Sequence, residues 1–189
     1  QPNGTISSVM RDYVNMLVST SAMLDEDLLE DAVTCLQQAE KIFILSFDST
    51  LMVAQDLQYK LALVGIHAID VHLMSNIQTF PSTVGEKDLI IVIVPTILLK
   101  DIYRAVTVCK DRGASILAIT SYDSPKLDNL VDYKFVTSDK ITAQNSIGLS
   151  NNLVFLYAAD VLYCALLHRN KALRQKKLAS DAVLNDQLH

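Results

Sequence analysis

The sequence predicts a single α/β domain, built as a three-layer α/β/α sandwich around a five-stranded parallel sheet. Short β-prone runs alternate along the chain with segments whose apolar residues recur at helical spacing. Several of the β-prone runs are apolar throughout, which is typical of strands covered on both faces. The 189 residues, half of them hydrophobic, suit one core, and no repeat or linker interrupts them.

The first third of the chain reads as two helices followed by a strand and a third helix. Helical spacing covers residues 6–17 and again 28–36, with Asp25 as the expected N-cap of the second helix. A short β-prone run at 41–45 predicts the first strand. The helical period then resumes from residue 53 and ends at Gly65.

The alternation continues through the middle of the chain. A strand is predicted over 68–73, followed by a loop through Pro81. The unbroken apolar run 88–94 predicts a fully covered strand. A helix is expected from about 98 to 112, because Gly113 is a typical residue just after a helix end.

The last part completes the sheet. Residues 115–120 predict another buried strand, a polar segment spans 121–129, and 133–137 predict a short edge strand. The helix expected at 151–169 is apolar around most of its circumference. One core-facing stripe does not explain that pattern, so we predict self-association through a second apolar face.

Composition excludes several classes of protein. The net charge of −5 argues against a nucleic-acid-binding surface on this chain. Cys35, Cys109 and Cys164 are too widely spaced for a disulfide framework or a metal site, so we expect them to be small buried hydrophobic residues, and we predict no metal or cofactor. Neither a signal peptide nor a membrane-spanning run is visible, which predicts a cytoplasmic protein.

Candidate ligand-binding residues follow the predicted strands. Ligands of open parallel sheets bind beyond the carboxyl ends of the strands, which directs attention to residues 46–50, 74–83, 95–99 and 121–124. Hydroxyls just before a helix can hold a phosphate, but helix capping alone also favours these residue types. The candidate residues are Ser46, Phe47, Asp48, Ser49, Thr50, Thr96, Ser121 and Ser124.

Other polar residues have simpler interpretations. His67 and His72 flank or lie within a predicted strand, and we favour a structural role over a ligand-binding one for both. Lys60 is expected to be a solvated residue at the flank of a helix.

Ordered segments along most of the chain resemble SIS (sugar isomerase) domains of MurR/RpiR-type bacterial transcription regulators. Residues 44–57 resemble the first strand, turn and helix of that family, and 113–121 resemble its Gly-Ala-x-Val-Ile-x-Ile-Thr segment. Ser-Pro at 124–125 and Val-Asp at 131–132 match further landmarks, while Asp-Val-Leu-Tyr at 160–163 resembles the final helix. The resemblance implies a flavodoxin-like SIS fold that binds a sugar phosphate or related carbohydrate derivative.

The family also implies that DNA binding and ligand binding lie in separate domains. In such regulators a helix-turn-helix domain precedes the SIS domain, so residues 1–24 are expected to form a connecting helix and 25–189 the SIS domain. A chain that starts at Gln1 rather than Met is expected to be an excised fragment. DNA is then bound only through the absent domain, and the resemblance again implies a homodimer or tetramer.

Two turns depart from the family pattern. The first usually reads Gly-x-Gly-x-Ser, but Ser46 and Asp48 replace the glycines and Thr50 the serine. Asp48 is expected either to repel a phosphate or to cap the helix that begins near Thr50. The second turn, Ser-x-Ser-Gly-x-Thr in the family, aligns with residues 94–99, where only Thr96 keeps a hydroxyl. The sequence thus predicts a degenerate phosphate site.

The catalytic base of the SIS isomerases is a Glu near the start of a late helix. Between Ser138 and Asn152 the only acidic residue is Asp139, so we expect no enzymatic activity. The favoured function is effector sensing and dimerisation within a transcription regulator. An active phosphosugar isomerase and a dimerisation module without a ligand are the alternatives.

Overall fold

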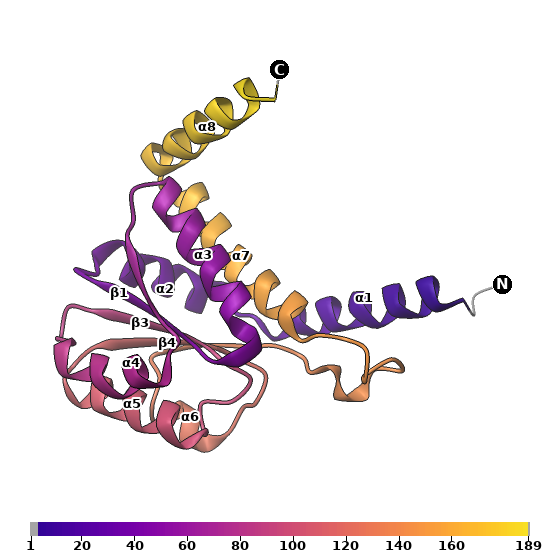
Figure 1. Cartoon of the computed structure of the whole chain (residues 1–189), viewed down its shortest axis with the longest axis horizontal. Helices are drawn as coiled ribbons and strands as arrows, with labels where there is room; N and C mark the ends of the chain where they lie inside the picture. Colours follow the sequence, from indigo (N-terminus) through magenta and orange to yellow (C-terminus); the bar gives the residue numbers. More distant parts are fainter. Residues whose placement is uncertain (1–3, 189) are drawn as a thin grey trace.

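The computed structural model describes residues 4–188, and its five strands form one parallel sheet in the order β2-β1-β3-β4-β5 (Figure 1). This confirms the predicted fold class. Residues 1–3 of the expected connecting segment, and residue 189 of the expected SIS domain, lie outside the described residues. The strands are β1 (Ile42–Ser46), β2 (Ala68–Val71), β3 (Leu89–Ile93), β4 (Ser115–Thr120) and β5 (Tyr133–Val136).

Helices cover both faces of the sheet, which completes the three layers (Figure 1). One face carries α2 (Glu26–Gln38), α3 (Leu51–Leu63) and α7 (Asn152–Arg169). The other carries α4 (Met74–Thr79), α5 (Lys100–Asp111) and α6 (Pro125–Asp128). The remaining elements are α1 (Thr5–Met23), α8 (Lys171–Asp186) and the short 3-10 helices η1 (Asp48–Thr50), η2 (Phe80–Thr83) and η3 (Lys140–Thr142).

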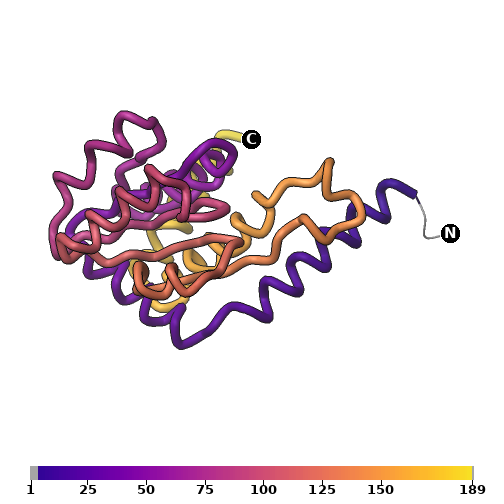
Figure 2. Tube along the Cα trace, turned by 90° about the horizontal axis from the view of Figure 1, so that it is seen from below, coloured from indigo at the N-terminus to yellow at the C-terminus, as the bar shows by residue number. Residues whose placement is uncertain are grey.

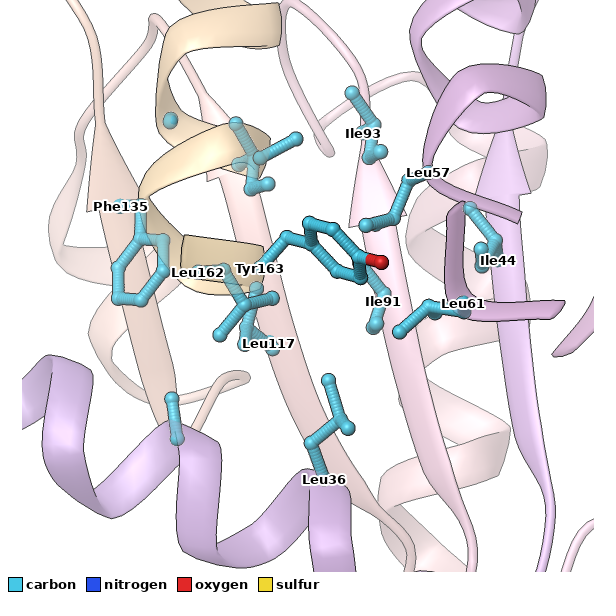
Figure 3. Close-up of a cluster of buried hydrophobic side chains, with 14 of the residues drawn as sticks. Leu36, Ile44, Leu57, Leu61, Ile91, Ile93, Leu117, Phe135, Leu162 and Tyr163 are labelled. Atoms are coloured by element: carbon cyan, nitrogen blue, oxygen red, sulfur yellow. The ribbon is translucent and has the colours of Figure 1, made fainter. Parts of the chain in front are cut away.

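The central strands are buried on both sides because alternate residues point into two separate cores. Ile44, Ile91 and Leu117 contribute to the core beneath α2, α3 and α7 (Figure 3). Their neighbours along the strands, such as Leu45 and Val92, contribute to the core beneath α4 and α5. The apolar runs of the sequence are explained by this two-sided burial.

Lys60 joins α3 to α7 and is not the solvated residue that the sequence suggested. Its side chain is only 19% exposed and forms ion pairs with Asp56 and Asp160. Its ammonium lies 5.3 Å from the centre of the Tyr163 ring, and the Tyr163 hydroxyl donates to the Lys60 carbonyl at 3.0 Å. These neighbouring carboxylates raise the pKa of Lys60 although partial burial opposes them.

The loop predicted through Pro81 is wrong, because residues 74–83 form α4 and η2. Ile77 and Phe80 pack into the second core, so burial favours a helical conformation. The Thr79 hydroxyl donates to the Ser75 carbonyl at 2.9 Å, within the helix. This segment lacks a clear helical period, so its helical conformation could not be predicted from the sequence.

The reason offered for self-association through the last predicted helix is also wrong. Within the described chain, α7 packs against α1, α2, α3 and α8 as well as against the sheet, which explains why it is apolar around most of its surface. The sequence did not predict α8, which has no buried residue. Its start is fixed by Asn170, whose side chain accepts from the Leu173 amide at 3.1 Å.

The cysteines differ in their surroundings, contrary to the expectation that all three are buried. Cys109 is buried, and that burial raises the pKa of its thiol to about 12. Cys35 is half-buried and Cys164 is exposed on α7. Across residues 4–188, none of the helices combines the length and the apolar character needed to cross a membrane.

Candidate ligand-binding crevice

Three loops meet at the carboxyl edge of the sheet. Ser46 at the end of β1 lies in register with Ile93 of β3, which in turn pairs with Ile119 of β4. The turns at 47–50, 94–99 and 121–124 are therefore neighbours, as the sequence predicted. We call these three neighbouring turns the candidate crevice.

The first turn keeps the backbone shape that its missing glycine would favour. Asp48 has φ of 57°, the left-handed region that glycine adopts readily. The Thr50 hydroxyl is buried and holds the turn closed: it accepts from the Phe47 amide at 3.2 Å and donates to the Phe47 carbonyl at 3.0 Å. Ser46 is also buried, and among residues 4–188 its hydroxyl has no hydrogen-bond partner.

The capping role considered for Asp48 is wrong. The helix α3 begins at Leu51 with Thr50 as its N-cap, and no side chain caps it. Asp48 is exposed, and its carboxylate forms no hydrogen bond or ion pair within the described residues. Both Asp48 and Ser49 thus project from the rim of the turn.

The second turn differs from expectation in where its apolar side chains point. Val94 and Ile97 are buried in the second core, so they do not line the crevice. The Thr96 hydroxyl accepts from the Leu98 amide at 3.1 Å, and Leu99 is 40% exposed. The turn therefore offers one hydroxyl, already bonded to its own backbone, and one exposed apolar side chain.

The third turn is tied to the second. The Ser121 hydroxyl lies 3.2 Å from the Pro95 carbonyl and 3.3 Å from a carboxylate oxygen of Asp139. The hydroxyl of Ser124 is buried and has no partner within the described chain. Of the eight candidate residues, the structure thus places all eight along three adjacent turns, but Thr50, Thr96 and Ser121 already use their hydroxyls in hydrogen bonds.

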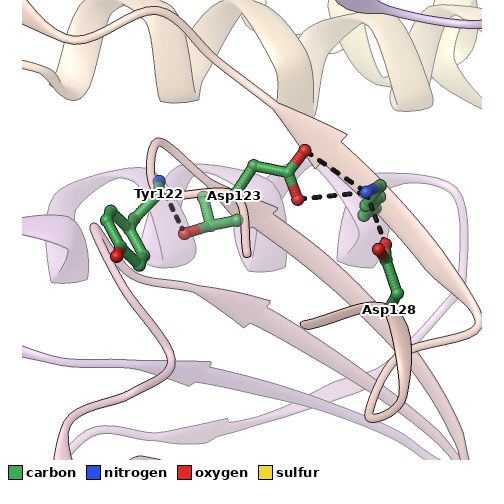
Figure 4. Close-up of polar contacts among 5 residues, drawn as sticks. Tyr122, Asp123 and Asp128 are labelled. Carbon is green, nitrogen blue, oxygen red and sulfur yellow. Dashed lines mark hydrogen bonds and ion pairs between the residues drawn. The ribbon is translucent and has the colours of Figure 1, made fainter. Parts of the chain in front are cut away.

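An ion-pair cluster fixes the exposed part of this turn (Figure 4). The ammonium of Lys134, on the edge strand β5, lies between the carboxylates of Asp123 and Asp128. These carboxylates raise its pKa, Asp128 more than Asp123. Tyr122, whose amide donates to the Thr120 hydroxyl at 3.4 Å, leaves its ring 55% exposed beside the crevice.

Residues 137–152 form a further wall that the sequence did not identify. Asn152 donates from its side-chain amide to the Ser49 carbonyl at 2.8 Å. Asp139 accepts from the Ile141 amide at 2.9 Å and from the Asn151 side chain at 3.2 Å, besides its contact with Ser121. We call residues 137–152 the bridging segment. Its asparagines gave no sequence signal, because their partners are distant along the chain.

The histidines have structural surroundings. His72 follows the edge strand β2, and its Nδ1 lies 2.9 Å from a carboxylate oxygen of Asp70. His67 is exposed before the same strand. This pairing agrees with the structural role that we favoured for His72.

Comparison with known proteins identifies the family. The SIS domain model matches residues 35–165. The chain belongs to the SIS domain family. An HTH-type transcriptional regulator of Clostridium perfringens is 21% identical over 96% of this chain, and the alignment spans 66% of that regulator. The chain thus spans just under two thirds of this curated relative.

Solved SIS structures share the fold. The Vibrio vulnificus NanR protein complexed with ManNAc-6P has a TM-score of 0.80 at 19% identity, covering 93% of this chain and 67% of NanR. The sugar isomerase domain of an RpiR transcription factor from Sphaerobacter thermophilus has a TM-score of 0.79 at 16% identity, covering 96% and 97%. At such identities these structures show the SIS fold alone.

Proposed function

We propose that this SIS domain senses a carbohydrate-derived effector and self-associates within a transcription regulator, and that it is not an enzyme. The single observation that carries the proposal against catalysis is the state of Asp139. It is the only acidic residue of the bridging segment, and it accepts hydrogen bonds from Ile141 and Asn151 and contacts Ser121. Because these three contacts occupy the carboxylate in holding the segment and the third turn together, it is poorly placed to shuttle a proton.

The likeness to a curated HTH-type regulator supports a regulatory role. DNA binding then belongs to a part of the regulator beyond this chain, because the chain itself carries a net charge of −5. We expect this chain alone to give no operator-dependent gel shift. A sequence-specific gel shift by residues 1–189 would contradict the proposal that DNA binding belongs to another part of the regulator.

The effector is proposed to be a sugar phosphate or related carbohydrate derivative that binds at the three turns. Asp48 disfavours a phosphate dianion there, while exposed Leu99 and Tyr122 favour a ligand with an apolar substituent. The deciding measurement is a thermal-shift screen that compares ManNAc-6P with unphosphorylated ManNAc and other amino sugars, since a ligand of the folded state raises its melting temperature. Interconversion of aldose and ketose phosphates by the chain would instead favour an isomerase.

Self-association is proposed to use α1 rather than α7. Ile6, Met10, Val14 and Val18 recur every four residues along α1 and are 88%, 61%, 48% and 65% exposed. Such a continuous apolar stripe is typical of a protein–protein contact. We infer that a second copy covers it. A dimerisation module without any ligand remains the alternative, and a blank ligand screen of a dimeric chain would favour it.

A further inference from the structure

The bridging segment contacts the crevice on one side and α1 on the other. In Figure 2 it runs alongside α1 before it enters α7. On the crevice side, Asn152 holds the Ser49 carbonyl and Asp139 contacts Ser121. A ligand that displaced either contact would therefore act directly on this segment.

On the other side, a buried carboxylate of α1 holds the same segment. Asp12 is only 7% exposed and accepts from the Gln144 amide at 3.2 Å, the Asn145 amide at 2.9 Å and the Asn145 side chain at 2.7 Å. The hydrogen bond from the Asn145 side chain is the largest cause of a lowered pKa for Asp12, so the carboxylate stays charged and keeps accepting.

A second attachment lies about one to two turns further along α1. Ser138 donates from its hydroxyl to the Met16 carbonyl at 2.9 Å, and its amide donates to the Thr20 hydroxyl at 3.0 Å. Thr20 is fully buried. Because Ser138 is the residue before Asp139, the attachment to α1 and the contact with Ser121 come from adjacent residues of one strand end. A shift of Ser138 relative to α1 would therefore also disturb the contact between Asp139 and Ser121.

We propose that the bridging segment couples the crevice to α1, so that ordering of the turns at 46–50 and 121–124 and docking of α1 favour one another. This inference rests on the proposed sensing function and names its route of regulation. Coupling of this kind is reciprocal: a change that weakens the docking of α1 also makes the turns less ordered, and a change that disorders the turns also weakens the docking of α1. An effector shifts the position of α1 only by the difference in its affinity for the two arrangements.

The test is hydrogen exchange on the whole chain without ligand. Asp12→Asn keeps the shape of the side chain but replaces one of its two accepting oxygens with an NH2 donor and removes the charge, so it weakens the attachment through Gln144 and Asn145. We expect amides in 46–50 and 121–124 to exchange roughly threefold to tenfold faster than in the unmodified protein. Asp111→Asn on α5, an exposed aspartate on the opposite face of the sheet, is the matched control and should change nothing.

The opposite direction, from the crevice to α1, is tested with Asn152→Ala. This substitution removes the hydrogen bond to the Ser49 carbonyl and should accelerate hydrogen exchange in residues 8–20 of α1. If Asp12→Asn does not fold, Ser138→Ala tests the same attachment. Faster exchange confined to the altered segment and its immediate partner would overturn the coupling. The proposed sensing function is tested separately by the thermal-shift screen of ManNAc-6P, unphosphorylated ManNAc and other amino sugars. Coupling without a shift by any of these ligands, or a shift without coupling, identifies which of the two ideas fails.

Discussion

Replacing Asp48 with Asn and with Gly separates the charge of this residue from its backbone strain. Asp48 is exposed and has φ of 57°, and its carboxylate forms no hydrogen bond or ion pair within the described residues. At a separation of about 5 Å and an effective dielectric of about 40, its carboxylate and one phosphate charge repel by about 1.7 kcal/mol. We therefore expect Asp48→Asn to raise phosphosugar affinity by a factor on the order of ten.

The glycine variant adds a change in stability. A residue other than glycine in the left-handed region lowers the stability of the fold by roughly 1–2 kcal/mol, which glycine would avoid. The greater freedom of glycine in the unfolded chain offsets about 0.4–1 kcal/mol of this gain. Asp48→Gly should thus stabilise the fold by about 0.5–1 kcal/mol, or roughly 1–4 °C in Tm at this chain length. Asp48→Asn should leave stability within about 0.5 kcal/mol, because Asn also tolerates this conformation.

Calorimetry with ManNAc-6P and thermal melts of the three proteins measure both effects. Equal affinity of the unmodified protein and Asp48→Asn would refute the electrostatic argument. Tight binding by the unmodified protein would refute the proposed position of the phosphate. A Gly variant less stable than the unmodified protein would refute the argument from strain.

Three further predictions concern other parts of the chain. Gly113→Ala should lower stability by about 1–2 kcal/mol in a thermal melt, because φ is +88° and an added Cβ meets Glu86 Cβ at 3.1 Å; Gly148→Ala, with its nearest contact at 3.8 Å, is the control. Val14→Asp should shift the protein toward monomer in sedimentation velocity, and an unchanged dimer would exclude the α1 stripe. Asp12 has a lowered folded-state pKa, so its contribution is complete above its unfolded pKa and lost as pH falls through the folded one. The Tm difference between the unmodified protein and Asp12→Asn should therefore shrink below about pH 4.

The sequence predicted the sheet well because its signal is local. Residues 42–45 and 89–93 are apolar throughout and buried on both faces, which is the pattern expected of central parallel strands. The position of the candidate crevice followed from the general rule for parallel sheets, which needs only the strand ends. Residues 74–83 escaped prediction because their helical form depends on burying Ile77 and Phe80 in a distant core.

The contacts of the bridging segment with the crevice and with α1 could not be predicted from the sequence, because each joins residues that are far apart along the chain. Asn152 and Ser49 are 103 residues apart, and Asp12 lies 133 residues from Asn145. No periodicity or spacing brings such pairs together. Asp48 is a different case: its replacement of a glycine was visible, but whether the backbone would keep the left-handed turn depended on the surrounding fold.

The orientation of α1 links these observations. Helical spacing over residues 6–17 predicted the helix but not which of its sides is buried: Met10 and Val14 face outward, while Asp12 and Thr20 are buried. On its inner side the helix is held by hydrogen bonds to the bridging segment and by apolar packing, because Met16 forms a small core with Leu149 and Val154. Burial of the outer stripe by a second copy would add a further, non-directional contribution on the opposite side of the helix. Under the proposed self-association, α1 would connect the bridging segment of one copy to the second copy, so that a change at the crevice would reach both copies.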